Sequence, residues 1–172
     1  MKKKSSSLVI VVVAVIVAVL AFALPKLMSQ NEEAVSAEAG EKDVRNLSES
    51  EDLVILLDKV TNNVTFYAVD VDGTEMEVMA VRDSSGNIRT AFNTCQVCYS
   101  SGRGYYQQEG NDLVCQNCGN SFTTDQVGLE SGGCNPVPIM DNDRKITDTS
   151  ITISYDFLKN YKEIFAQWKT GF

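Results

Sequence analysis

The sequence contains no histidine among its 172 residues. This absence excludes Ser-His-Asp and Cys-His catalysis, because both need an imidazole as the base. It also excludes histidine-ligated zinc, Rieske-type clusters and CxxCH haem attachment. Any metal chemistry of this chain must therefore use other side chains.

Positive charge is also scarce. The chain has 15 Lys and Arg residues against 23 Asp and Glu, which gives a formal net charge of -8 at pH 7. Three of the lysines, Lys2, Lys3 and Lys4, stand at the extreme N-terminus. A body this acidic repels phosphate backbones, so we expect no nucleic-acid partner.

One long apolar run is present, "LVIVVVAVIVAVLAFAL" from Leu8 to Leu24. As a helix it is roughly 25 Å long, near the lower limit for crossing a membrane. Lysines precede it and acidic residues follow it, which places the N-terminus in the cytoplasm and the remainder outside. A cleaved signal peptide is the alternative, with "VSA" at Val35 to Ala37 as its cleavage site, but that site lies far from the run. We therefore predict an uncleaved signal-anchor over residues 1–24 and a single-pass protein of the cell membrane.

The rest of the chain divides into two parts by composition. Residues 25–50 are polar and acidic without apolar periodicity, which predicts a flexible linker. Residues 51–172 carry the apolar and cysteine residues of a folded domain, which the topology places outside the cytoplasm.

The pattern within this domain predicts mainly β-structure. Residues 52–60 form a short apolar run, and residues 64–82 read as a hairpin with its turn at Asp72-Gly73. After a turn at residues 84–87, a strand over residues 88–92 leads to the first cysteine, and residues 145–157 predict one or two further strands.

A helix is predicted at the C-terminal end, over residues 156–168, with Asp156 as its N-cap. Apolar residues recur there with helical spacing and are expected to pack on the core: Phe157, Tyr161, Ile164, Phe165 and Trp168. The expected fold class is mainly β with a C-terminal α-helix (α+β), preceded by one transmembrane helix.

The five cysteines have a distinctive spacing. Cys95-x2-Cys98 is followed after sixteen residues by Cys115-x2-Cys118, and Cys134 lies fifteen residues further on. Two Cys-x-x-Cys pairs at this separation are typical of a four-sulfur metal site. Such a site suits iron, an iron–sulfur cluster, zinc or copper.

Disulfides are the alternative, because exported domains often contain them. The odd number of cysteines and the short loops that each pair would close argue against a purely disulfide framework. A redox-active pair also favours a helix opening at its first cysteine, whereas glycine, tyrosine and glutamine flank these pairs. We predict that Tyr99, Tyr105 and Tyr106, which crowd the site, serve in packing.

The carboxylates near the cysteines in the sequence are few: Glu109, Asp112 and Asp125. They assemble no evident acid–base pair. The pattern therefore favours a metal-binding or electron-transfer protein over an enzyme.

The segments "AFNTCQVCYSSGRGYYQQEGNDLVCQNCGNSF" and "VGLESGGCNPVPI" resemble the bacterial membrane-anchored iron–sulfur-containing (FtrD-like) family, which is associated with ferrous-iron transport. The resemblance covers residues 91–139 well and the preceding hairpin more loosely. It implies metal ligation by Cys95, Cys98, Cys115 and Cys118, with Cys134 as an additional ligand or partner. It also implies a redox role beside an iron permease.

These patterns lead to one spatial expectation and three competing functions. The two cysteine pairs should converge on turns that follow β-strands, with Cys134 beside them. The first function is electron transfer or metal handling for a membrane permease or redox partner. The others are a thiol–disulfide oxidoreductase and a structural interaction module held by zinc.

Overall fold

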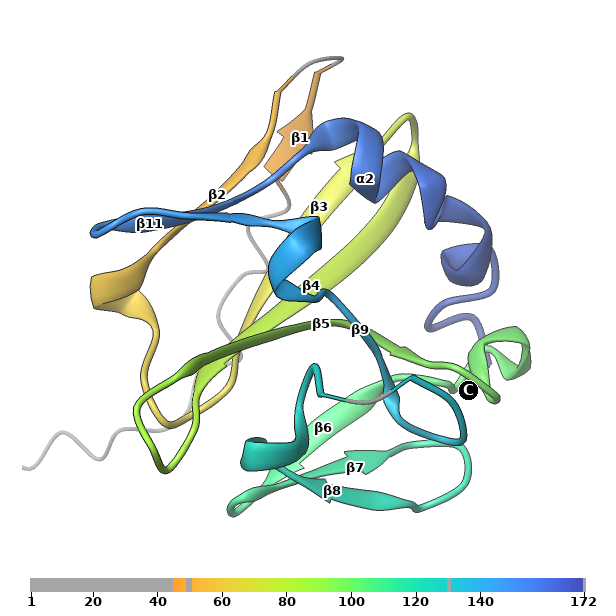
Figure 1. The fold of residues 1–172 in the computed structure, drawn as a ribbon. Coiled ribbons are helices and arrows are strands. Elements are labelled where there is room, and N and C mark those ends of the chain that lie inside the picture. The colour runs from red at the N-terminus through yellow and green to blue at the C-terminus, as the bar shows by residue number, and fades with distance from the viewer. Residues whose placement is uncertain (1–44, 49–50, 130, 172) are drawn as a thin grey trace, which may run out of the picture. The chain divides into compact units, whose positions relative to one another are not determined.

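Three small β-sheets form the described part of the chain, which is residues 45–48, 51–129 and 131–171 of a computed structural model (Figure 1). The largest has the order β1 (Arg45–Leu47), β3 (Thr65–Val71), β4 (Thr74–Arg82), β5 (Ile88–Cys95), β9 (Pro136–Pro138). The second has the order β10 (Lys145–Ile146), β11 (Ser150–Ile153), β2 (Leu53–Leu56). The third has the order β6 (Tyr106–Glu109), β7 (Asp112–Cys115), β8 (Ser121–Thr123).

Helical structure within the described residues is limited. The α-helix is α2 (Tyr155–Asn160). Short 3-10 helices are η1 (Leu57–Lys59), η2 (Tyr99–Ser101), η3 (Thr124–Gln126), η4 (Asp141–Asp143) and η5 (Lys162–Phe165). The domain is thus mainly β with one short C-terminal helix, as the sequence predicts.

The β3–β4 hairpin confirms the predicted turn. Its two central residues, Asp72 and Gly73, have φ angles of 49° and 74°, and Val71 pairs with Thr74 across the strands. Two consecutive left-handed residues match the right-handed twist of the flanking strands. Strand β5 also forms where a strand is predicted, and it continues to Cys95, so it delivers the chain directly to the first cysteine.

The region predicted as a linker contains a strand. Arg45–Leu47 forms β1, which pairs in parallel with β3. Leu47 is only 6% exposed and packs with the core of the large sheet. A three-residue strand with one buried leucine has too little periodicity to stand out from a polar segment.

The predicted C-terminal helix is shorter than expected. Helix α2 ends at Asn160, and η5 continues the chain as a 3-10 helix. The N-cap is Ser154, whose side chain accepts a hydrogen bond from the Phe157 amide, so the prediction of Asp156 as N-cap was wrong. Asp156 lies within the first turn instead, where its negative charge interacts favourably with the positive end of the helix dipole.

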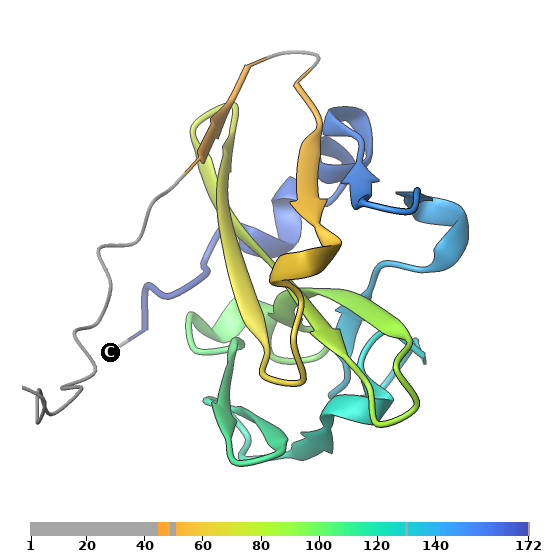
Figure 2. The same ribbon diagram turned by 90° about the vertical axis from the view of Figure 1, so that its left-hand side faces the viewer.

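The predicted packing of the aromatic residues is confirmed. Phe92 of β5 lies within 4.8–5.9 Å, centroid to centroid, of the rings of Phe157, Tyr161 and Phe165. Phe165 and Trp168 are buried. Helix α2 and η5 therefore cover β3, β4 and β5 of the large sheet (Figure 2).

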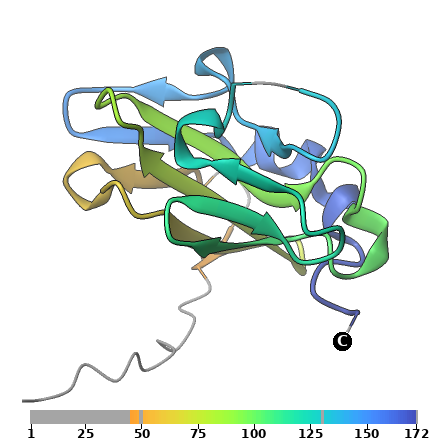
Figure 3. The same ribbon diagram turned by 90° about the horizontal axis from the view of Figure 1, so that it is seen from below.

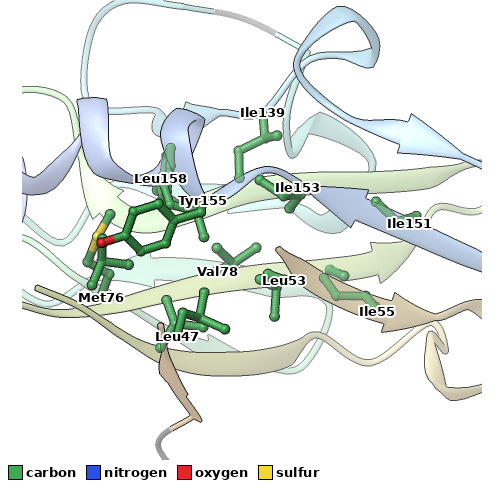
Figure 4. Close-up of a cluster of buried hydrophobic side chains, with 14 of the residues drawn as sticks. Leu47, Leu53, Ile55, Met76, Val78, Ile139, Ile151, Ile153, Tyr155 and Leu158 are labelled. Carbon is green, nitrogen blue, oxygen red and sulfur yellow. The ribbon is translucent and has the colours of Figure 1, made fainter. Parts of the chain in front are cut away.

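Two hydrophobic clusters stabilise the domain. The first joins the large sheet, the β2–β11 pair and α2, and Figure 4 shows side chains such as Val78, Leu53, Ile153 and Leu158 meeting there. The second contains Cys95, Cys98 and Cys115 together with apolar residues of β4, β5 and the third sheet. Seen from below, the third sheet lies in front of the large one (Figure 3), so the cysteines belong to the layer between them.

No helix within the described ranges is long and apolar enough to cross a membrane. The predicted membrane segment, Leu8 to Leu24, lies outside those ranges, as does most of the predicted linker.

Candidate metal centre

The five cysteines come together at one place in the fold. The sulfurs of Cys95, Cys98 and Cys115 lie within 4.8 Å of one another. The sulfurs of Cys98, Cys118 and Cys134 also lie within 4.8 Å of one another. Because Cys98 belongs to both groups, the five sulfurs form one continuous set, which we call the cysteine cluster.

Each Cys-x-x-Cys pair begins at the last residue of a strand and continues through a turn. Cys95 ends β5 and Cys115 ends β7. In the first pair, the Cys98 amide donates to the Cys95 sulfur at 3.4 Å. In the second, the Gly119 amide donates to the Cys115 carbonyl at 2.9 Å, and Gly119 has a φ of 73°, which glycine adopts without strain. The pairs thus lie on turns after β-strands, as predicted.

The cluster has a buried side and an open side. Cys95, Cys98 and Cys115 are at most 7% exposed, Cys134 is half-buried, and Cys118 is exposed. The five cysteines are free thiols, without a disulfide between them. Solvent and partner molecules can therefore reach the cluster at the Cys118 edge.

Burial and hydrogen bonding give the five thiols different acidities. Burial raises the pKa of Cys115 to about 12, although backbone N–H groups of Cys118 and Asn117 act in the opposite direction. The hydrogen bond with Cys118 is the main reason that the pKa of Cys134 rises to about 12. Protons on these two thiols must leave when they ligate a metal, so metal binding releases protons.

Cys95 and Cys118 have pKa values below the usual one. Burial raises the pKa of Cys95, but hydrogen bonds from the Tyr106 hydroxyl and from the Val97 and Cys98 amides together outweigh it. A backbone hydrogen bond from Asn120 is the largest cause of the lowered pKa of Cys118. One cysteine of each pair is therefore favoured as a thiolate, the form that binds metal.

A buried polar network that the sequence pattern does not predict supports the strand that leads to the cluster. Asn93, 1% exposed, donates through Nδ2 to a carboxylate oxygen of Glu77 at 2.5 Å. Glu77 is 5% exposed and is also paired with Lys169 at 3.4 Å. The indole N–H of Trp168 donates to the Asn93 carbonyl at 2.8 Å. The network fixes the end of β5 two residues before Cys95.

The three tyrosines near the cluster have different roles. Tyr106 is 1% exposed and packs in the second hydrophobic cluster, and its hydroxyl also donates to the Cys134 carbonyl. Tyr105 packs against the first cluster, with Lys169 Nζ 5.1 Å from its ring centroid. Tyr99 is 39% exposed, so the prediction that it packs in the core was wrong. It follows Cys98 directly in η2, which carries its side chain outward.

The carboxylates that the sequence places near the cysteines contribute elsewhere. Asp125 accepts hydrogen bonds from the Ser84 amide and hydroxyl, both at 2.7 Å. Glu109 and Asp112 pair across the far end of the β6–β7 hairpin. The cluster is thus a set of sulfur donors, which fits thiophilic ions and iron–sulfur clusters and suits hard, oxygen-seeking cations poorly.

A small β-domain that gathers five cysteines on turns belongs to the class of cysteine-rich domains that can hold a metal ion or cluster. Residues 60–165 match the family described as "Membrane iron-sulfur containing protein FtrD-like", and the chain belongs to this family. The matched residues include all five cysteines. The family is described as a membrane protein, in agreement with the resemblance noted in the sequence. The chain matches no curated protein and no solved structure.

Proposed function

We propose that this protein is a membrane-anchored electron-transfer or metal-handling protein that holds iron or an iron–sulfur cluster outside the cytoplasm. Cys95, Cys98, Cys115 and Cys118 are its ligands, and Cys134 is a fifth ligand or a thiol beside them. Thiolate-bound iron supplies one-electron chemistry. The observation that carries the proposal is the convergence of five sulfurs from three separate segments. The anchor is the apolar run from Leu8 to Leu24.

The burial of the cluster supports metal binding over thiol–disulfide exchange. A disulfide substrate must reach the attacking sulfur, but both cysteines of the first pair are buried, and in the second pair Cys118 is exposed while its partner Cys115 is buried. Cys95 also ends a strand and is followed by a turn, rather than opening an α-helix that would activate it. Buried thiols with backbone N–H groups directed at them are well placed as ligands.

The surface around the exposed Cys118 suits a partner that exchanges electrons or metal. Residues 96–102, 116–124 and 131–140 contain no Asp, Glu, Lys or Arg, although charged residues make up 22% of the chain. Val97 and Tyr99 are 60% and 39% exposed there. We propose that a membrane permease or a redox protein docks on this uncharged edge, with an association that depends little on salt.

Cysteine variants test this assignment of ligands. The full chain, purified in detergent without oxygen, is compared with Cys95→Ser and Cys134→Ser by metal analysis and by visible absorption. Cys95→Ser should abolish metal binding, and Cys134→Ser should lower the metal content or shift the spectrum.

The same experiment separates the competing functions. A colourless protein with one zinc per chain would favour the structural module. A metal-free protein whose cysteines resist alkylation until they are reduced would favour the oxidoreductase.

A further inference from the structure

Tyr106 connects the segments that carry the cysteines. It stands on β6 directly opposite Cys115 in the β6–β7 ladder. Its hydroxyl donates to the backbone carbonyl of Cys134, 28 residues away, and lies close enough to the Cys95 thiol to lower the pKa of that thiol. One buried hydroxyl therefore contacts the first cysteine of the β5 pair and the turn of the fifth cysteine.

The backbone of Tyr106 is held on both sides by one buried amide. Its N–H donates to Asn93 Oδ1 at 2.7 Å, and its carbonyl accepts from Asn93 Nδ2 at 3.3 Å. Glu77 and Trp168 fix Asn93 in turn through the buried network described above. The ring itself makes an edge contact with Phe122 of β8, with a centroid distance of 6.1 Å. The hydroxyl thus has a position set by packing and by backbone contacts, which is what precise support of a ligand requires.

We propose that Tyr106 is a positioning residue of the cysteine cluster: its single hydroxyl proton is donated to the Cys134 carbonyl, which holds the Cys134 turn, and with it the fifth sulfur, against the other four. The proposal rests on the proposed function only in that the cluster is the metal site. A ligand held in place before the metal binds keeps its geometry when the metal is bound.

The test uses Tyr106→Phe in the full chain, since this change removes the hydroxyl and keeps the ring. The control is Tyr67→Phe, the same chemical change in β3, where the ring packs against the first hydrophobic cluster. In the reduced, metal-free protein, the alkylation rate of each cysteine is followed by peptide mass spectrometry. We expect Cys134 to react about fivefold faster in Tyr106→Phe and unchanged in Tyr67→Phe, because the Cys134 turn loses one hydrogen bond.

The buried Cys98, whose pKa does not depend on Tyr106, serves as the internal reference in the same samples. An unchanged rate at Cys134 would overturn the proposal. An increase that Cys98 shares equally would also overturn it, because it would report general loosening of the fold. This measurement needs no metal, so it decides the positioning role even if the wild-type protein binds none and the proposed function fails.

Discussion

At the scale of single residues, the positions of the cysteines depend on Asn93, which is not itself a candidate metal ligand. Asn93 uses both ends of its amide, accepting from the Tyr106 N–H and donating to Glu77 and to the Tyr106 carbonyl. Asn93 is 1% exposed, and Tyr106 and Glu77 are buried as well, so water cannot replace the hydrogen bonds that are lost when the amide is removed. Asn93 is therefore a structural requirement for the geometry of the cluster.

Asn93→Ala should lower the free energy of unfolding by about 3 kcal/mol, because it leaves the buried Tyr106 amide without its hydrogen bond and removes one donor from the buried Glu77 carboxylate. Denaturant unfolding of the metal-free protein measures this change. Asn62→Ala, at an exposed position, is the control and should change stability by no more than about 0.5 kcal/mol. Equal stabilities of the two variants would show that the network contributes nothing.

Residue types and spacing predict the cysteines as site candidates but not the residues that support them. Two Cys-x-x-Cys pairs are recognisable because the ligand geometry is local to each turn. The Glu77–Asn93 pair joins residues sixteen positions apart, and the Asn93–Trp168 bond joins residues 75 apart. Such contacts have no local pattern, because only the pairing of β4 with β5 and the path of the C-terminal segment bring them together.

At the scale of elements, the turn of the first cysteine pair depends on a close approach by Gly104. A Cβ at this position would overlap the Cys98 carbonyl group and lie 2.7 Å from the Tyr99 amide nitrogen. The Gly104 carbonyl also accepts from the Cys95 amide at 2.7 Å. The segment that enters β6 thus lies directly against the turn that carries Cys95 and Cys98.

Gly104→Ala should displace this turn and lower metal affinity at least about tenfold, because a ligand set tolerates little distortion. Competition with a chromophoric chelator measures the affinity. Gly110→Ala is the control: Gly110 lies at the tip of the β6–β7 hairpin, and its added Cβ meets no atom within 4 Å. That change should cost about 1 kcal/mol of stability, since Gly110 has a φ of 63°, and should leave affinity unchanged. Similar affinities of the two variants would contradict the account.

The β3–β4 turn and α2 are joined by Asp72. Its carboxylate accepts from the Tyr155 hydroxyl and pairs with Lys159 at 3.1 Å and Lys162 at 3.4 Å. These contacts, the Tyr155 hydrogen bond first, lower the pKa of Asp72 from 3.8 to about 2. A depressed pKa means that the folded state favours the ionised carboxylate.

The contribution of Asp72 to stability should therefore be complete above its ordinary pKa of 3.8 and should disappear as the pH falls toward 2. Asp72→Asn removes this contribution and retains a residue that tolerates the left-handed turn. Urea unfolding of both proteins across this pH range should give curves that approach each other at low pH. A constant separation across the range would rule out the role of the ionised carboxylate.

The elements themselves were predictable to different degrees for physical reasons. The β3–β4 hairpin combines alternating apolar residues with Asp-Gly, and both signals agree. The C-terminal helix has helical periodicity, but its last part becomes 3-10 where Trp168 bonds to the Asn93 carbonyl and Phe165 packs on Phe92. Strand β1 is stabilised by pairing with β3, which a three-residue segment does not reveal.

At the scale of the whole molecule, charge and chemistry are separated. The chain carries a net charge of -8, yet residues 96–102, 116–124 and 131–140, which carry Cys98, Cys118 and Cys134, contain no charged side chain. Charge of this sign disfavours phosphate backbones, and the absence of a nucleic-acid partner stays a prediction. We propose the uncharged edge at the exposed Cys118 as the place where a partner approaches the cluster, because contact there desolvates no charged groups.

The most direct test of the central claim is a redox titration of the full chain, purified without oxygen and analysed for metal in the same sample. We predict thiolate-bound iron, visible absorption that bleaches reversibly on one-electron reduction, and loss of both iron and colour in Cys95→Ser. A colourless protein that binds no iron under these conditions, or one whose iron and spectrum persist in Cys95→Ser, would contradict it.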